Sequence, residues 1–396
     1  MRIVFTNPVG VIGGAERAML TYMTILLNQS EYSIEIFLIV GTEGELILAA
    51  EELGVQVQCL PIPEALSQLG DSAFKWNNRQ KLAVFLLLRK LWKSLYDCNI
   101  YQKKFKETLI KINPDVVHSN GIKTHLIAAL STPHNIPLVW HIHDFYSYRP
   151  LIAKILKYFS HRATLGIAIS QAVAQDSAQV VPELSIQTIY NTVDTIYFSP
   201  APFIPHSSLR VGLVATFARW KGQDIFLQAI TTLTQDYPEL EAEFYIIGGP
   251  IYKTQGSQFS QPELEELATQ LGIAHRVKFL GFQNKIVDIY RWLDIVVHAS
   301  TQPEPFGLAI IEAMACGKPV IVAQAGGAAE LFTHNQDAIG VSPGDSQSLA
   351  QAIADLLQNP QKCQTLAKKA RQTVVQHFNN QQLEQQLIKL YHQAIK

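Results

Sequence analysis

Two glutamates in the second half of the chain lie in a segment that suits a ligand rich in hydroxyl groups. Residues 300–308 read Ser-Thr-Gln-Pro-Glu-Pro-Phe-Gly-Leu and contain Glu304, and Glu312 follows eight positions later. The apolar pattern over 307–315 predicts a helix, so one glutamate is expected on a loop and the other inside the helix. A carboxylate accepts hydrogen bonds on both oxygens, which suits adjacent hydroxyl groups of a sugar.

Main-chain N–H groups and two cations in the same half suit a phosphate. The N–H groups of Phe306, Gly307 and Leu308 stand at the expected helix start, where the unpaired donors and the helix dipole favour an anion. Arg219 and Lys221 precede a glycine at an expected strand-to-helix turn. Arginine forms forked hydrogen bonds and lysine supplies a point charge, so this turn suits a diphosphate. Taken alone, it could equally be an exposed basic turn without a ligand.

Two loops of the first half carry further candidates. In the segment 7–17, Gly13 and Gly14 stand at a helix start, where a backbone without side chains can approach an anion. This segment contains neither GxGxxG nor GK[ST], which disfavours a nicotinamide cofactor and excludes a P-loop. His143 and Asp144 lie just past the end of another expected strand, and the pair is compatible with metal binding, with proton transfer or with a structural cap.

Alternating strands and helices must position these residues. The apolar runs predict strands at 2–6, 33–40, 55–60, 115–118, 138–141, 166–169, 210–216, 242–247, 277–280, 295–298 and 319–323. Helical patterns fall at 14–27, 124–130, 223–234, 261–271 and 307–315. This alternation predicts an α/β fold with parallel sheets, which bind ligands beyond the carboxyl ends of their strands.

A proline-rich segment divides the chain. Residues 199–206 contain three prolines directly before a new strand, which is typical of a linker. We therefore expect two doubly wound domains, residues 1–200 and 201–375. Residues 376–396 are expected to form a C-terminal helix that packs back on the first domain.

The composition excludes several classes of protein. Of the 396 residues, 48% are hydrophobic and 16% are charged, which excludes a disordered chain, a collagen-like chain and a disulfide scaffold. The 32 basic and 33 acidic residues nearly balance, so the net charge gives no argument for nucleic acid. The four cysteines are widely spaced and form no CxxC pair, which fits a reducing compartment. The sequence also shows no signal-peptide pattern and no apolar run near ~20 residues, so we expect a cytoplasmic protein.

One stretch departs from this balance. Residues 73–111 hold ten lysines and arginines against two acidic residues, mixed with aromatic and apolar side chains. The stretch could form an amphipathic helix on an anionic membrane surface. A core-packing helix with a solvated basic face is the alternative, and the sequence does not decide between them.

The motifs taken together resemble the family 4 retaining glycosyltransferases. The resemblance rests on the segments Gly13–Arg17, Lys221-Gly222, Glu304–Gly307 and Glu312–Gly317, in that order over nearly the whole chain. Further similarity comes from Asn191–Asp194 with Phe198-Ser199-Pro200, and from Gly326-Gly327 with Glu330. The two glutamates eight residues apart, Glu304 and Glu312, are the most specific part of this resemblance.

The resemblance implies a fold and a reaction. The fold would be GT-B, in which two Rossmann-like domains face each other across a cleft, with the nucleotide sugar on the C-terminal domain and the acceptor mainly on the N-terminal one. The reaction would transfer a sugar from a nucleoside-diphosphate sugar to a hydroxyl acceptor with retention at the anomeric carbon. The basic stretch 73–111 is compatible with a glycan or lipid-linked acceptor, as in polysaccharide or glycolipid synthesis, and equally with a soluble acceptor. The enzyme is therefore expected in the cytoplasm, either free or peripherally at the inner face of the membrane.

The resemblance also assigns roles to residues. Lys221 and a nearby arginine would contact the diphosphate, and Glu312 would hold the ribose hydroxyls. Glu304 and His143 would act at the donor sugar, close to the N–H groups of Phe306, Gly307 and Leu308. Gly14 would let the first loop reach the diphosphate or the sugar.

This sequence departs from the family where a Gly-Arg pair usually follows the strand. Ala215-Thr216 occupies those positions, so Arg219 is expected to supply the guanidinium from a different place. No DxD triplet occurs anywhere, which predicts a metal-independent site without a cofactor. The alternatives are a GT-B relative that carries out epimerisation or phosphorolysis, and a non-catalytic sugar-binding protein.

Overall fold

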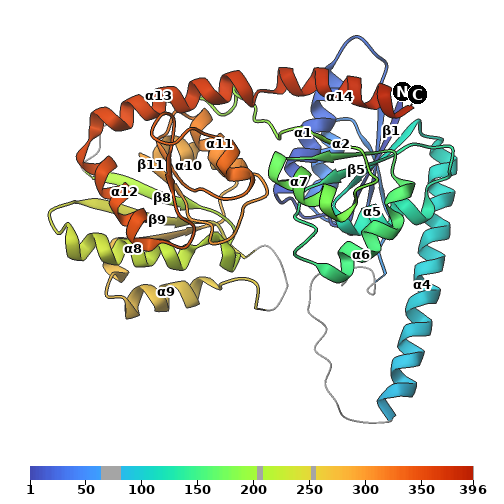
Figure 1. Ribbon diagram of the computed structural model, residues 1–396, viewed down its shortest axis with the longest axis horizontal. Coiled ribbons are helices and arrows are strands. Elements are labelled where there is room, and N and C mark those ends of the chain that lie inside the picture. Colours follow the sequence, from blue (N-terminus) through green and yellow to red (C-terminus); the bar gives the residue numbers. More distant parts are fainter. Residues whose placement is uncertain (64–81, 203–207, 251–255, 396) are drawn as a thin grey trace. The chain divides into compact units, whose positions relative to one another are not determined.

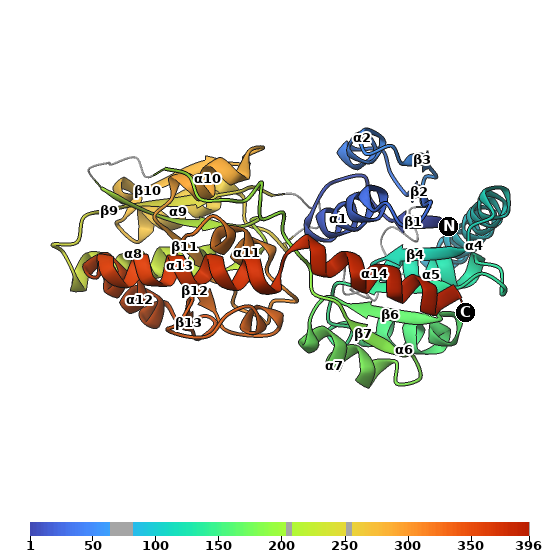
Figure 2. The same ribbon diagram turned by 90° about the horizontal axis from the view of Figure 1, so that it is seen from above.

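The computed structural model describes residues 1–63, 82–202, 208–250 and 256–395, and of residues 82–95 the backbone alone. Contacts divide the chain into two units. Unit 1 comprises Met1–Ile189 together with Leu383–Lys396, and unit 2 comprises Tyr190–Gln382. Both units consist of a parallel sheet with helices on its two faces, the arrangement that the sequence predicts (Figures 1 and 2).

Unit 1 contains, among its described residues, a sheet of seven parallel strands in the order β3-β2-β1-β4-β5-β6-β7. The strands are β1 Arg2–Asn7, β2 Glu35–Val40, β3 Gln56–Cys59, β4 Val116–Asn120, β5 Leu138–Ile142, β6 Leu165–Ala168 and β7 Ile186–Thr188. The helices are α1 Gly14–Asn28, α2 Glu45–Glu52, α4 Leu82–Ile112, α5 Ile122–Ser131, α6 Pro150–Phe159 and α7 Gln171–Val180, with the 3₁₀ turn η1 Ser160–Arg162.

Unit 2 has six described parallel strands in the order β10-β9-β8-β11-β12-β13. They are β8 Leu209–Val214, β9 Ala242–Ile247, β10 Val277–Gly281, β11 Ile295–His298, β12 Val320–Ala323 and β13 Ile339–Val341. The helices are α8 Gln223–Asp236, α9 Gln261–Gln270, α10 Ile286–Trp292, α11 Leu308–Ala315, α12 Ser346–Gln358 and α13 Pro360–His377, and the 3₁₀ turns are η2 Arg219–Lys221, η3 Ala274–Arg276 and η4 Gly327–Glu330.

The strand predictions hold for the central strands and fail at two edges. All eleven predicted strands are present within a few residues of their expected bounds. The sequence analysis gave no strand for β7 or β13. Each has only three residues and pairs with a single neighbour, so neither offers a long apolar run to detect.

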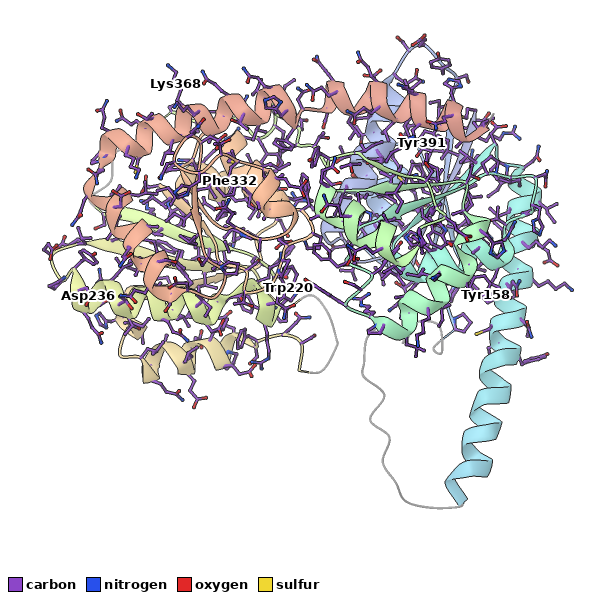
Figure 3. All side chains as sticks on the ribbon, viewed as in Figure 1. Tyr158, Trp220, Asp236, Phe332, Lys368 and Tyr391 are labelled. Atoms are coloured by element: carbon purple, nitrogen blue, oxygen red, sulfur yellow. The ribbon has the colours of Figure 1, made fainter. Side chains whose placement is uncertain are left out.

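The last helix belongs to the core of unit 1, although it follows unit 2 in the chain. Helix α14 spans Asn380–Ile395, and it lies along unit 1 in both ribbon views. Its buried residues join the apolar cluster that contains α1 and the central strands of unit 1: Leu383, Leu387, Leu390, Tyr391 and Ala394. Tyr391 extends from α14 into unit 1 (Figure 3), where its hydroxyl lies 2.8 Å from Nδ1 of His118.

Residues 190–200, which the sequence analysis placed in the first domain, are bonded within unit 2. The N–H group of Val193 donates to the carbonyl of Phe378, and the hydroxyl of Tyr190 donates to Glu330. The contact boundary therefore falls at residue 190, ahead of the prolines that mark the linker in the sequence.

The basic stretch 73–111 lies partly outside the described residues. Its later part forms α4, a helix of 31 residues. Within the described ranges, no helix is both long enough and apolar enough to span a bilayer.

Candidate active site

The candidate residues of unit 2 gather where the strand order reverses. Strands β8 and β11 are neighbours in the sheet but not in the chain, and open α/β sheets bind ligands beyond the carboxyl ends of such a pair. Turn η2, with Lys221, follows β8, and Glu304 follows β11. Figure 3 labels Trp220, the residue beside Lys221 in this turn.

A buried ion pair forms the centre of this site. Nζ of Lys221 lies 2.7 Å from Oε2 of Glu304, and Glu304 is only 6% exposed. The same oxygen lies 3.1 Å from Nε2 of His298 and accepts a hydrogen bond from the hydroxyl of Ser300 at 3.0 Å. Three groups therefore converge on Oε2, whereas Oε1 of Glu304 has no hydrogen-bond partner in the described part of the chain.

These partners keep Glu304 ionised. Burial by itself would raise the pKa of the carboxyl, but the charge of Lys221 and the hydrogen bond from His298 outweigh it and lower the pKa to about 2. Lys221 also lies over the ring of Trp220, 4.1 Å from its centroid. The site thus holds one cation and one carboxylate with little exposure to water.

Two glycines allow the backbone to bring this pair together. Gly222 has φ +75°, and a Cβ there would lie 1.9 Å from the carbonyl oxygen of Ala299. Gly326 has φ +65°, and a Cβ there would lie 2.5 Å from the carbonyl oxygen of Glu304. The next N–H group, that of Gly327, donates to this carbonyl at 2.7 Å, so the second glycine pair braces the loop of Glu304.

The predicted anion-binding N–H groups lie at the start of α11. Phe306 is buried and packs against Tyr190 and Phe378, Gly307 caps the helix, and Leu308 is its first residue. Glu312 lies one turn further along α11 and is 3% exposed; its Oε2 accepts a hydrogen bond from the hydroxyl of Tyr290 at 2.9 Å.

Arg219 makes its contacts with other groups of unit 2. Its guanidinium donates to Glu263 at 2.7 Å and to the carbonyl of Gly256 at 3.1 Å, and it lies over the ring of Phe259. Both members of the ion pair with Glu263 are about half exposed. A diphosphate contact by Arg219 would require this surface pair to open, and the assignment stays a prediction.

In unit 1, the predicted residues lie at the corresponding reversal between β1 and β4. Gly14 is the exposed first residue of α1, in the loop after β1. His143 directly follows β5 and is 9% exposed. Its Nε2 lies 2.6 Å from Oδ1 of Asn120, the last residue of β4, and Asn120 donates to Asn7, the last residue of β1.

His143 is one of four buried histidines in this part of unit 1, and the pKa of each is lowered. Burial lowers the pKa of His143 and of His118 to about 3, and it places those of His125 and His141 well below the ordinary value. The ring centroids of His141 and His143 lie 4.0 Å apart. His143 is therefore neutral at physiological pH and can exchange hydrogen bonds but holds no positive charge.

The sequence analysis assigned no role to four polar residues of these sites. His298, Ser300, Asn7 and Asn120 all lie at or just after predicted strand ends, and that position is the signal that could have singled them out. In the described ranges, no group of three or more histidine, cysteine, aspartate or glutamate side chains is arranged to hold a metal ion.

Sequence profiles of two glycosyltransferase groups match the chain. "Glycosyl transferases group 1" matches residues 198–373, and "Glycosyltransferase Family 4" matches residues 44–197. A D-inositol 3-phosphate glycosyltransferase of Corynebacterium urealyticum is 34% identical over 48% of this chain and 44% of its own length, so the chain spans less than half of that relative. An N-acetyl-alpha-D-glucosaminyl L-malate synthase of Bacillus anthracis is 24% identical over 74% of this chain and 78% of its own length.

Solved structures resemble the chain over its full length. Anabaena Alr3699/HepE in complex with UDP has a TM-score of 0.79 and 27% identity, covering 99% of this chain and 100% of that one. The same protein in complex with UDP-glucose gives a TM-score of 0.80 at 26% identity, again covering 99% and 100%. A sucrose-phosphate synthase from Thermosynechococcus elongatus has the same fold, with a TM-score of 0.77 at 19% identity over 99% and 98% of the two chains.

Proposed function

The chain belongs to the family 4 glycosyltransferases and has the GT-B fold, and we propose that it transfers a sugar from a nucleoside-diphosphate sugar to a hydroxyl acceptor. The observation that carries the proposal is the buried pair of Lys221 and Glu304 at the strand-order reversal of unit 2. Helix α11 begins four residues after Glu304 and adds N–H groups for an anion. One site thus offers partners for both halves of a nucleotide sugar.

The free oxygen of Glu304 suggests how the sugar is held. Because Oε2 is already occupied by three groups, Oε1 is the oxygen that can accept a hydrogen bond from a hydroxyl of the donor sugar. Lys221 would then contact the diphosphate while remaining beside Glu304, and Glu312 would accept from the ribose hydroxyls. His143 and Gly14, on unit 1, would act at the sugar and the diphosphate.

The donor that we propose is a UDP-sugar. Support comes from the structures of Anabaena Alr3699/HepE with UDP and with UDP-glucose, which resemble this chain over its full length. UDP-glucose is therefore the first donor to test. The acceptor that we propose is a glycan or a lipid-linked hydroxyl compound.

The proposed reaction retains the configuration at the anomeric carbon and needs no metal ion. The bond between C1 and the diphosphate oxygen breaks, and the acceptor oxygen bonds to C1 on the same face. The acceptor proton passes to the departing phosphate oxygen. Lys221 and the N–H groups at the start of α11 would stabilise the charge that gathers on this phosphate. The anomeric proton coupling in the NMR spectrum of the product tests retention, and an inverted product would refute this route.

Calorimetric binding of UDP, GDP and ADP tests the donor site. We expect UDP to bind the wild-type protein, and Lys221→Met and Glu312→Ala to weaken its binding by about 10-fold or more, because each removes a hydrogen bond to a charged or buried group. Lys278→Met is a matched control, since Lys278 pairs with Glu243 near the amino ends of β10 and β9, at the opposite edge of the sheet. Equal binding of UDP by the wild type and all three variants would overturn the placement of the site.

We also propose that residues 73–111 contact an anionic membrane surface. The proposal rests on the composition of this stretch, with ten basic and two acidic residues among aromatic and apolar ones. Sedimentation with vesicles of phosphatidylglycerol and phosphatidylcholine should show binding that weakens as salt rises. No salt-sensitive binding would overturn it.

A further inference from the structure

A chain of buried hydrogen bonds connects the glycine loop of unit 1 to His143. Oε2 of Glu16 accepts from the N–H group of Gly13 at 3.0 Å, and its Oε1 accepts from Nδ2 of Asn7 at 3.1 Å. Oδ1 of Asn7 accepts from Nδ2 of Asn120 at 2.8 Å, and Oδ1 of Asn120 lies 2.6 Å from Nε2 of His143. Asn7 and Asn120 are each 1% exposed, and Glu16 is 8% exposed.

The acceptors around Asn7 give this chain a direction. Burial raises the pKa of Glu16, whereas the hydrogen bonds from Asn7 and Gly13 favour its carboxylate form. Nδ2 of Asn7 donates to Glu16 and also to the carbonyl of Val9 at 2.7 Å, and a carbonyl only accepts, so the amide oxygen of Asn7 must face Asn120. The amide nitrogen of Asn120 then donates to Asn7, which turns its oxygen towards His143. An oxygen at this position requires a proton on Nε2, because the facing pair otherwise consists of two acceptors.

The other ring nitrogen of His143 is left as an acceptor. A neutral imidazole with a proton on Nε2 carries a lone pair on Nδ1. In the ranges that the structure describes, Nδ1 of His143 has no hydrogen-bond partner. Burial also holds the pKa of this ring at about 3, so protonation does not compete for the lone pair near neutral pH.

We propose that Glu16, Asn7 and Asn120 are positioning residues that hold His143 as its Nε2–H tautomer, so that Nδ1 accepts a hydrogen bond from a sugar hydroxyl. The part played by the sugar rests on the proposed function, whereas the tautomer does not. The three positioning residues come from α1, β1 and β4, so the orientation of His143 is set by residues distant from it in the sequence.

The nitrogen NMR spectrum of the full chain labelled with [15N]histidine tests the tautomer directly. The two tautomers differ in which ring nitrogen is protonated, and the signal of His143 is assigned by its loss in His143→Gln. We expect the wild-type ring to be protonated on Nε2. A ring protonated on Nδ1 overturns the proposal.

Glu16→Gln should disturb the chain of donors at Asn7. The oxygen of the new amide must still accept from Gly13, so its nitrogen faces the nitrogen of Asn7, and Asn7 can turn over only by giving up its hydrogen bond to the carbonyl of Val9. We therefore expect the Nδ1–H tautomer of His143 to become populated beside the Nε2–H tautomer, although Glu16 does not touch His143. An unchanged spectrum for Glu16→Gln would show that Glu16 is not a positioning residue.

Two further variants keep the test decisive if Glu16→Gln does not fold. Asn120→Leu removes the acceptor for Nε2–H, so we expect a mixture of tautomers, and a single unchanged tautomer counts against the proposal. Ser119→Ala is the matched control: Ser119 neighbours Asn120 on β4 and is also buried, but its hydroxyl bonds to His125 and to the carbonyl of Val139. It should leave the signal of His143 unchanged.

Kinetics separates the positioning role from the donor site. In Asn120→Leu we expect kcat to fall about 10-fold, as for a lost hydrogen bond to the sugar, while the affinity for UDP stays at the wild-type value. A wild-type protein that transfers no sugar would count against the proposed function and leave the NMR result standing. Normal kcat in variants with a changed tautomer would show that His143 does not need its acceptor nitrogen.

Discussion

Lys221→Met should destabilise unit 2 because it leaves Glu304 buried without its cation. In the folded protein the pKa of Glu304 is about 2, against an ordinary value of 4.5. At ~1.4 kcal/mol for each pKa unit, this difference corresponds to about 3 to 4 kcal/mol of stability above pH 4.5, and the charge of Lys221 is the largest contribution that lowers the pKa. Its share is near the lower end of the cost of breaking a buried ion pair. The predicted effect is therefore a loss of about 3 kcal/mol at pH 7.

Cysteine labelling can measure this loss in unit 2 by itself. Cys316 is 1% exposed, and burial raises the pKa of its thiol to about 11, so it reacts only when unit 2 opens. A loss of about 3 kcal/mol should accelerate labelling of Cys316 about 100-fold, as read by mass spectrometry of its peptide. Lys278→Met removes an exposed pair from the same unit and should leave the rate nearly unchanged.

The dependence on pH provides a second check. The folded pKa of Glu304 is depressed, so its contribution is present above pH 4.5 and is lost as the pH falls towards 2. The penalty of Lys221→Met in urea unfolding should therefore shrink over this range. Labelling of Cys316 less than 3-fold faster than in the wild type, together with an equal penalty at pH 7 and pH 3, would refute the reasoning.

Three further changes have defined outcomes. Gly222→Ala should lower the melting temperature of unit 2 much more than Gly272→Ala. Both glycines have φ near +75°, but only at Gly222 would the added Cβ meet a carbonyl oxygen. Equal effects of the two substitutions would rule out the clash. His141→Phe should reduce the proton uptake on unfolding at pH 5 by about one proton. Burial keeps the pKa of His141 far below its ordinary value in the folded protein, so the ring takes up a proton only on unfolding, and wild-type stability falls as the pH drops below about 6.5. Calorimetry in two buffers measures this uptake, and an unchanged value would contradict the prediction. Tyr391→Phe should cost about 1–2 kcal/mol in urea unfolding of unit 1, because the ring nitrogen of His118 loses its buried partner; a neutral substitution would show that this hydrogen bond adds nothing.

The sequence predicted the parts of the molecule that depend on local pattern. Central strands contain apolar runs because helices cover both faces, and this made runs such as 295–297 easy to identify. Glu304, Glu312 and Lys221 were found because their loops combine glycines and charges at strand ends. The short edge strands β7 and β13 were not found, because three residues at the edge of a sheet leave almost no pattern.

Partnerships between side chains could not be predicted in the same way. The contact of Lys221 with Glu304 depends on two strands that lie side by side although 83 positions separate the two residues. The hydrogen bond between Asn7 and Asn120 spans 113 positions. Sequence reasoning placed each of these residues at a strand end, but which of them meet depends on the order of the strands in the sheet.

Helix α14 also imposes an order on the synthesis of the protein. The ribosome makes residues 1–189 first, but the core of unit 1 lacks Leu387, Leu390 and Tyr391 until the chain beyond residue 382 has emerged. At ~5–20 residues per second, the intervening residues 190–382 delay completion by roughly 10 to 40 seconds. Unit 2 is a continuous segment of the chain and can fold during that time, whereas the apolar surface of unit 1 against which α14 packs remains exposed. The part of the chain that is made first is therefore the last to be completed, and it is during this interval that a nascent chain would most need a chaperone.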